Sequence, residues 1–298
     1  MRCRLDSSDH FSCPCATVST AKSAHQPVAT RKSGQRGSAR AKASSDGVLP
    51  AVNLAEVRAQ SSEFPFGVQI GPHRLRMLLV PKVLLPPNKK ARLCLESGTL
   101  SFDNRLSGRE LAAEFVRAVI AGGHYCHGVT EKDITEETFT HSASSGFIAF
   151  AQANPVGIAW WLSELDADGR HGFLAAMFGR GRPPTVPKRV VVKKHGVRIE
   201  ELTPEQAKKG NRYGEFEYKR DTIRYLAALK GPTLATILLH ELLHAMHYLG
   251  GISHSTNWRV FCRHQPRLLV EFVMQNPSAW RYLLWHAFGH GRVAALNS

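Results

Sequence analysis

The sequence predicts an α+β fold, and three observations support this prediction. Residues 233–249 are mostly apolar and carry a polar stripe at helical spacing, which predicts a buried helix. Residues 214–226, just before it, contain two short strand-like runs joined by turn residues at 219–221. A similar order of strand, turn, strand and helix occurs 123 residues earlier in the chain. Small sheets followed by groups of helices are typical of the α+β class.

The helix predicted over Thr233–Leu249 has recognisable ends. Gly231 and Pro232 precede it, and a first helical turn tolerates proline because the missing N–H would have no partner there. Gly250 and Gly251 follow it, where a residue in the left-handed conformation commonly ends a helix. The pattern therefore indicates a helix of defined length.

Residues 240–244 of this helix read His-Glu-Leu-Leu-His. His240 and His244 are four residues apart, so their side chains point the same way and can share one Zn²⁺ ion. Glu241 is the predicted catalytic residue, the general base that deprotonates a zinc-activated water. Burying these groups without partners is costly, and a metal ion would satisfy them. The alternative is a buried helix whose histidines are hydrogen-bonded to protein groups.

A catalytic zinc needs three protein ligands, so one must come from outside this helix. We expect His254, which follows the glycine turn, to be the third metal ligand. The helix predicted over 256–275 carries two reserve candidates, His264 and Glu271. Asn257 is a poorer candidate because a neutral amide binds zinc weakly.

Two parts of the chain resemble each other in sequence at one offset. The offset is 123 residues and becomes 122 before the final block. The matching segments, in order, are 93–103 with 216–226, 107–112 with 230–235, 124–125 with 247–248, and 150–155 with 272–277. Weak similarity in a constant order predicts a tandem duplication.

The duplication bears on which residues can bind metal. In the first copy the three HExxH positions are occupied by Arg117, Ala118 and Ala121, so this copy cannot hold zinc in the same way. His124 keeps the place of His247 although the ligands are lost, so we expect a packing or hydrogen-bonding role for His247. It also lies about 10 Å along the helix axis from the first ligand, at 1.5 Å per residue.

The predicted organisation has four parts. Residues 1–50 form a disordered basic tail, because Ser, Ala, Arg and Lys dominate and little apolar surface can be buried. Residues 60–165 form the degenerate copy without HExxH. Residues 179–188, rich in glycine and proline, form a linker. Residues 189–290 form the copy that carries the HExxH helix.

Composition restricts the partners and the compartment. The formal net charge is +15, so nucleic acid is a candidate partner through a basic surface, with solvated positive surface as the alternative. No apolar run reaches the length of a membrane span, so we expect no membrane contact. The six cysteines are scattered, which favours a reducing compartment and a cytoplasmic location.

The HExxH segment resembles two zinc-peptidase families, over about a quarter to a third of the chain. His240–His244, followed by His254 and Trp258, resembles the SprT/Spartan-like proteases. Those proteases use a HExxH helix and a later histidine with an aromatic residue four positions on. The stretch Tyr213–Leu283 also resembles the ImmA/IrrE-type metallopeptidases, in which a strand, LLHELLHA and a later helix ending in Asn-Pro recur.

The ImmA/IrrE-type family takes its third ligand from a glutamate at the start of the later helix. Trp258 and Arg259 stand at those places in this chain. The first copy instead has Glu136-Glu137 there, without a HExxH motif.

Both resemblances imply a minimal zincin fold, with a small mixed sheet, an active-site helix and a following helix, and zinc-dependent peptide-bond hydrolysis. The substrate would be a protein or peptide held extended along strand Thr222–Leu226. Tyr248, His247 or Arg224 could stabilise the oxyanion. Two other functions are open: a zinc-stabilised pseudoenzyme or binding module, and a basic DNA-associated protein with a structural HExxH helix.

Overall fold

The computed structural model describes residues 62–129, 135–166, 184–210, 213–253 and 258–288. Each half of the described chain begins with four strands and ends with three long helices. The first half comprises β1 (Ser62–Ile70), β2 (His73–Val80), the short 3₁₀ helix η1 (Lys82–Leu84), β3 (Ala91–Cys94), β4 (Thr99–Asp103), α2 (Gly108–Cys126), α3 (Glu136–Ala153) and α4 (Pro155–Leu165). The second half comprises β5 (Arg189–Val192), β6 (His195–Leu202), α6 (Pro204–Gly210), β7 (Gly214–Glu217), β8 (Thr222–Leu226), α7 (Gly231–Leu249), α8 (Trp258–Gln275) and α9 (Pro277–Phe288).

The two halves share one sheet topology. The strand orders are β1-β2-β4-β3 and β5-β6-β8-β7. In both sheets the two central strands are parallel and each edge strand is antiparallel to its neighbour. The α+β class with small mixed sheets is therefore confirmed, whereas the origin of the two halves by duplication stays a prediction.

An asparagine makes the same contacts in each half. Asn154, between α3 and α4, accepts from the backbone N–H of Gln69 on β1 at 2.5 Å and donates to its carbonyl oxygen at 2.7 Å. Asn276, between α8 and α9, makes the same two bonds with Val191 on β5, both at 2.6 Å. Each amide also donates to the carbonyl four residues earlier, at 2.8 and 2.9 Å. These side chains fasten the end of a helix to the first strand of its sheet.

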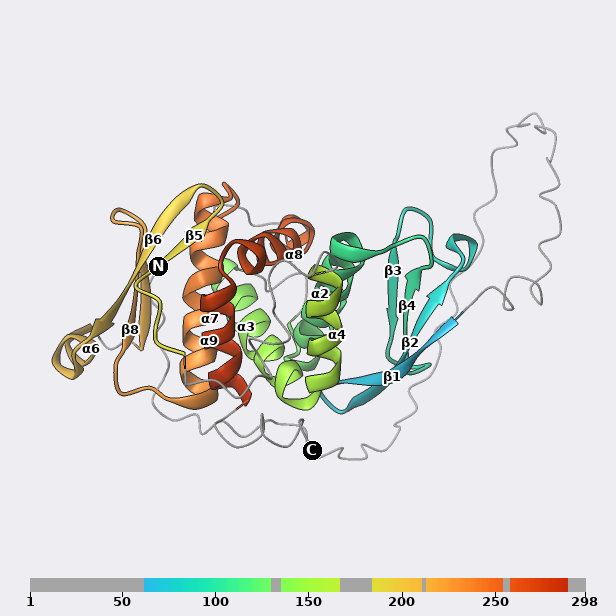
Figure 1. The fold of residues 1–298 in the computed structure, drawn as a ribbon, viewed down its shortest axis with the longest axis horizontal. Coiled ribbons are helices and arrows are strands. Elements are labelled where there is room, and N and C mark those ends of the chain that lie inside the picture. Colours follow the sequence, from blue (N-terminus) through green and yellow to red (C-terminus); the bar gives the residue numbers. More distant parts are fainter. Residues whose placement is uncertain (1–61, 130–134, 167–183, 211–212, 254–257, 289–298) are drawn as a thin grey trace, which may run out of the picture.

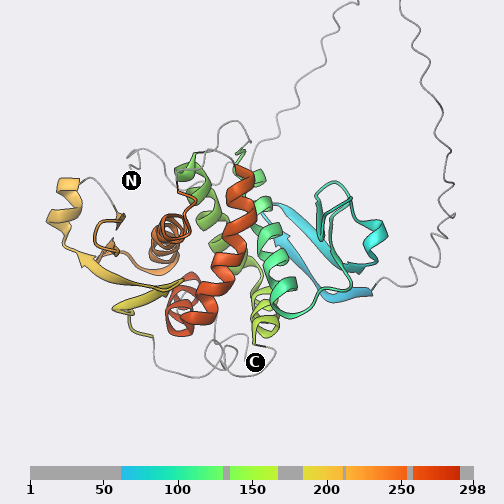
Figure 2. The same ribbon diagram turned by 90° about the horizontal axis from the view of Figure 1, so that it is seen from above.

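The helices form a layer between the two sheets, which lie at opposite ends of the molecule (Figures 1 and 2). The helices of the two halves interleave, because α3 packs against α7 and α8 packs against α2. The core is continuous across them. Trp161 of α4 and Trp280 of α9 meet edge to face at 5.5 Å, and Phe147 of α3 contacts both rings. α3 of the first half also packs directly against α7, the HExxH helix of the second half.

The predicted elements of the second half are confirmed with small changes in their bounds. The HExxH helix begins at Gly231, whose φ of 56° suits glycine, and ends before Gly251, whose φ is 71°. The two strands predicted in residues 214–226 are β7 and β8. The tail at 1–50 and the linker over 179–183 lie outside the described residues, whereas 184–188 are described.

The structure bears on the predictions about membrane spans and about cysteines. Within the described residues, no helix is long and apolar enough to cross a bilayer. Cys94, Cys126 and Cys262 are free thiols. The cytoplasmic location stays a prediction.

Candidate metal centre

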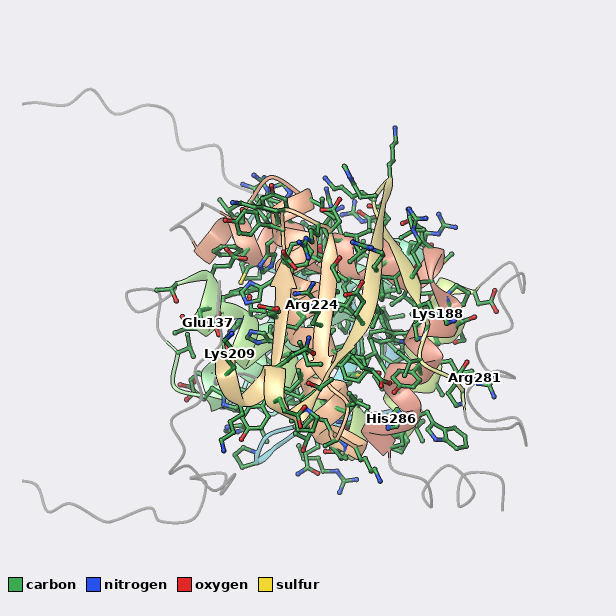
Figure 3. All side chains as sticks on the ribbon, turned by 90° about the vertical axis from the view of Figure 1, so that its left-hand side faces the viewer. Glu137, Lys188, Lys209, Arg224, Arg281 and His286 are labelled. Carbon is green, nitrogen blue, oxygen red and sulfur yellow. The ribbon has the colours of Figure 1, made fainter. Side chains whose placement is uncertain are left out.

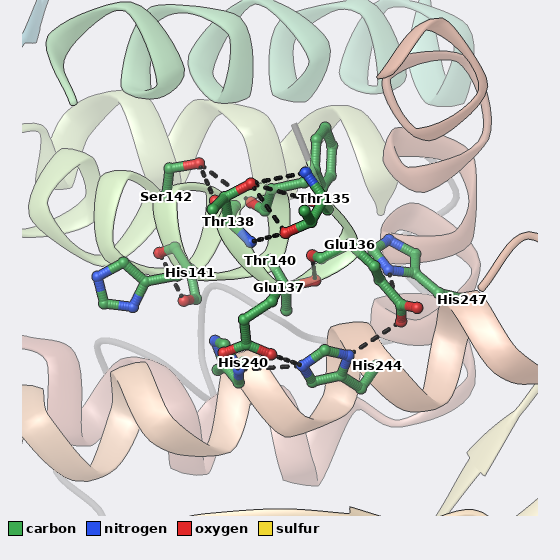
Figure 4. A network of polar contacts seen from close by, with 12 residues as sticks. Thr135, Glu136, Glu137, Thr138, Thr140, His141, Ser142, His240, His244 and His247 are labelled. Atoms are coloured by element: carbon green, nitrogen blue, oxygen red, sulfur yellow. Dashed lines mark hydrogen bonds and ion pairs between the residues drawn. The ribbon is translucent and has the colours of Figure 1, made fainter. Parts of the chain in front are cut away.

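The two histidines of the HExxH motif converge on one point. His240 and His244 lie one turn apart on α7, with exposed fractions of 2% and 6%. Their Nε2 atoms are 3.1 Å apart (Figure 4). The sequence prediction that both rings point the same way is therefore confirmed.

Glu137, at the start of α3, supplies the third group at this point. Its Oε2 lies 3.1 Å from Nε2 of His244, and its Oε1 lies 3.4 Å from Nε2 of His240. Thr135 and Thr138 form a capping box that fixes the first turn of α3 and so the direction of this side chain. Glu137, His240 and His244 are the group of described residues whose ligand atoms lie close enough together to hold a metal ion.

Glu136 contacts the other side of His244 (Figure 4). Its Oε1 lies 2.9 Å from Nδ1 of His244 and 3.5 Å from Nδ1 of His247. The carboxylate accepts a hydrogen bond from the Nδ1–H of His244, and the lone pair of Nε2 then faces Glu137 and His240. A carboxylate that binds the second ring nitrogen in this way orients metal-binding histidines in many proteins.

Burial and charge shift the pKa values of these groups in different directions. Burial would raise the pKa of Glu136, but hydrogen bonds from His244 and His247 outweigh burial and lower it to about 2. Burial would lower the pKa of His244, but hydrogen bonds to Glu136 and Glu137 raise it to about 9. For His240, burial dominates and the pKa falls. The site therefore concentrates negative charge around His244.

The donor set fits a zinc ion in composition and spacing. Zinc prefers nitrogen and carboxylate ligands, and ligand atoms at about 2.05 Å in a tetrahedron are about 3.3 Å from one another. The two Nε2 atoms are 3.1 Å apart, and each has one oxygen of the Glu137 carboxylate close to it, Oε2 at 3.1 Å from His244 and Oε1 at 3.4 Å from His240. Acceptor atoms this close repel one another unless a proton or a metal ion lies between them. A proton on His244 satisfies part of this requirement, and a divalent cation satisfies all three groups at once.

Glu241 lies on a different side of α7, against strand β7. Its side chain is 2% exposed, and a Cβ placed on Gly214 would lie 2.8 Å from its Oε1. Burial raises the pKa of Glu241 to about 8, the positive charge of His244 opposes this rise, and Glu137 adds to it. Only glycine leaves room for this carboxylate beside the strand, so Gly214 and Glu241 form one unit at the sheet edge.

None of the candidates predicted for the third metal ligand is seen beside His240 and His244 among the described residues. His254 and Asn257 lie outside the described residues, so the prediction for His254 stays open. His264 is exposed on α8, and Glu271 bonds to Gln275 at 3.1 Å in a groove against α2. Neither belongs to the group of described residues around the histidine pair.

Glu137 was not selected from the sequence, although a signal was present. Glu136 and Glu137 stand at the start of the later helix of the first half. The ImmA/IrrE-type metallopeptidases take their third ligand from a glutamate at the corresponding place. The third-ligand candidates predicted from the sequence all lie in the second half. The interleaved helices instead bring this pair to the HExxH helix of the other half.

The positions of His247 and Arg224 contradict the prediction that either one stabilises the oxyanion. The third candidate, Tyr248, is not placed at the metal centre. His247 is fully buried between Phe139 and Phe261, at ring separations of 5.8 and 4.9 Å, which confirms its packing role. Arg224 lies on the outer face of the second sheet, where Glu217 binds it at 2.9 Å (Figure 3). Tyr248 is 40% exposed and packs on aromatic rings of β7 and its turn.

The prediction that strand Thr222–Leu226 holds the substrate is also wrong. This strand, β8, is paired on one side with β6 and on the other with β7. Its backbone groups are already used by those two ladders. The edge strand beside α7 is β7, Gly214–Glu217.

The corresponding positions on α2 carry no metal-binding groups. Arg117 forms an ion pair with Glu114 at 3.5 Å, and Ala118 is buried. Ala121 is partly buried. His124, the counterpart of His247, is buried with its Nδ1 2.5 Å from Oγ of Ser142.

No protein-family model matches this chain, no curated protein matches it, and no solved structure matches its fold.

Proposed function

We propose that the chain is a zinc-dependent peptidase whose metal centre is shared between its two halves. One observation carries the proposal: the carboxylate of Glu137 lies 3.1 and 3.4 Å from the Nε2 atoms of His244 and His240. His240 and His244 come from one half and Glu137 from the other. This ligand set adds a residue of the first half to the ligands expected from the second half.

Zinc at such a centre supplies Lewis acidity, which lowers the pKa of water and polarises a carbonyl group. Glu241 is the general base: it accepts the proton of the attacking water and passes it to the leaving amine. The raised pKa of its carboxyl group, about 8, suits a group that must both accept and donate a proton near neutral pH. Glu136 orients His244 through Nδ1.

The substrate in this proposal is a protein or peptide in extended form. β7 is an edge strand, and its unpaired side offers backbone N–H and C=O groups to another strand. A peptide paired with β7 would pass Gly214, against which the carboxylate of Glu241 lies. The proposed base would thereby be next to the scissile bond.

We further propose that the two halves are diverged copies of one zincin-like unit. The shared strand order and the matched asparagine contacts support common descent. In this view one copy kept the histidines and the other kept the glutamate pair. Loss of the HExxH residues at Arg117, Ala118 and Ala121 would then have left one working centre from an original two.

A second candidate function is a metal that only stabilises the fold. Its support is the position of the centre, which joins α3 of one half to α7 of the other and in which both histidines are buried. A zinc-stabilised binding module of this kind would hold metal and cleave nothing.

The test is metal content together with cleavage of unfolded casein and of a fluorogenic peptide library. Glu241→Gln should retain zinc and lose cleavage, because it removes the base and no ligand. His240→Ala should lose both. Arg117→Ala, at the position on α2 that corresponds to His240, is the matched control and should change neither. Cleavage by Glu241→Gln at the wild-type rate would refute the peptidase proposal, and zinc without any cleavage by wild type would favour the binding module.

A further inference from the structure

A hollow of about 440 Å³ lies at the β1 edge of the first sheet. The two sheets lie at opposite ends of the molecule (Figure 1), so this hollow is far from β7. Two phenylalanines, two arginines and a tight turn surround it. Its lining residues are Phe64, Phe66, Gly67, Arg74, Leu75, Arg76, Ser97 and Gly98. The volume is in the range of small-ligand sites and suits one flat ring with a charged substituent.

The outer face of this sheet is basic. Arg74 and Arg76 on β2 are exposed, and Leu75 and Met77, which alternate with them, are fully buried against the helices. Arg92 on β3 is exposed. Within the described part of the chain, Arg74 and Arg92 form no ion pair. Their charges are therefore available to an anionic partner.

The second sheet provides a comparison on the same scaffold. Ser101 of β4 is flanked by Leu78 and Arg92, whereas its counterpart Arg224 is flanked by two glutamates. Arg224 is held by Glu200, Glu215 and Glu217 at 2.9 to 3.3 Å. Figure 3 looks onto this face of the second sheet and labels Arg224. Among the described residues, this cluster of carboxylates has no counterpart around Ser101 of the first sheet.

The hollow itself also differs between the two sheets. Gly67 lies opposite Arg76 in the β1–β2 ladder, and Arg189 takes the corresponding place opposite Arg198. The guanidinium of Arg189 occupies the space that a Cβ on Gly196 would need, so this arginine covers its own sheet. Gly67 has no side chain, so no group at this position covers the first sheet.

We propose that the basic face and the hollow bind single-stranded nucleic acid. One base enters the hollow against the exposed parts of Phe64 and Phe66, whose rings also contact Trp160 of α4. The guanidinium groups of Arg74, Arg76 and Arg92 bind phosphates. Aromatic rings beside arginines are the usual means of binding unpaired bases, because every base presents a flat face. A base within a duplex cannot enter, since it is stacked and paired. The formal net charge of +15 would assist the approach of such a polyanion.

The experiment measures binding of the full chain to a fluorescent single-stranded DNA of ~15 nucleotides, a length within the site sizes of such proteins, by fluorescence anisotropy. The variant Arg74→Gln/Arg76→Gln/Arg92→Gln should lose about 100-fold in affinity at ~0.1 M salt, because three phosphate contacts disappear. The slope of log affinity against log salt should become shallower by about 2. Phe66→Leu keeps an apolar side chain and should lose about tenfold, at unchanged salt slope.

The matched control is Arg189→Gln/Arg198→Gln/Arg220→Gln on the second sheet, which removes the same charge. It should bind like wild type. Equal loss in both triple variants would overturn the proposal, as would wild-type binding by the first triple variant or no binding by wild type. Equal affinity for the matching duplex or for phosphatidylserine vesicles would also overturn it. None of these outcomes depends on the zinc content of the protein. The test of nucleic-acid binding is therefore independent of the proposed peptidase activity.

Discussion

Glu136 and Glu137 are neighbours in sequence with different predicted tasks, and replacing each by glutamine separates them. Glu137 faces both Nε2 atoms, whereas Glu136 faces Nδ1 of His244. Glu137→Gln removes a proposed ligand. Glu136→Gln leaves all three ligand atoms in place and removes only the charge that orients one of them.

The contacts set the size of the two effects. Loss of a carboxylate behind a metal-binding histidine costs about 10- to 100-fold in metal affinity, or about 1.4 to 2.7 kcal/mol. Glu136 has one such contact, a 2.9 Å bond to His244, so Glu136→Gln should fall in this range. Glu137 contacts both histidines directly, so Glu137→Gln should exceed about 100-fold.

The assay is zinc affinity by competition with a chromophoric chelator, with metal content after dialysis measured by mass spectrometry. Glu110→Gln, an exposed position in the first turn of α2, is the control and should match wild type. If Glu137→Gln binds zinc as tightly as wild type, the shared centre is refuted. If Glu136→Gln is the more damaging of the two, the assigned roles are reversed.

Three further predictions concern stability. Removing zinc with a chelator should lower Tm and increase hydrogen exchange in both α3 and α7, since the proposed ligands come from both; an increase confined to α7 would contradict the shared centre. Burial lowers the pKa of His124 from 6.5 to about 4, so the unfolded chain binds the proton first and stability falls as pH drops from 6.5 to about 4. His124→Gln should remove about 3 kcal/mol of this acid-dependent loss, measured by urea unfolding at several pH values; an unchanged pH profile would contradict the assignment. Asn154→Ala and Asn276→Ala should each cost about 3 kcal/mol in urea unfolding, because each leaves backbone groups of an edge strand without a partner; a cost below about 1 kcal/mol for either would show that its bonds to the strand are not structural.

Local signals in the sequence were sufficient for the elements around the HExxH motif. Glycine and proline at 231 and 232 and glycine at 250 and 251 bound the helix as predicted, within two residues at its start. The turn residues at 219–221 separate two strands as predicted. Spacing of four residues placed His240 and His244 on one side of the helix, because helical geometry alone decides it.

Long-range packing decided what the sequence reasoning missed. Glu137 and His244 are separated by 107 positions, and only the packing of α3 against α7 brings them together. The spacing of apolar residues along the sequence does not reveal that these two helices pack against each other. The edge strand was also misassigned, because β7 and β8 follow each other in sequence, whereas β8 pairs with β6 on its other side. A turn signal predicts two strands but not which of them lies at the edge.

The most direct test of the shared metal centre is the zinc content of the full chain purified from metal-replete cells. We predict one zinc per chain for wild type and close to none for Glu137→Gln and for His244→Ala. Absence of a transition metal from wild type, or full zinc content in Glu137→Gln, would contradict the central claim.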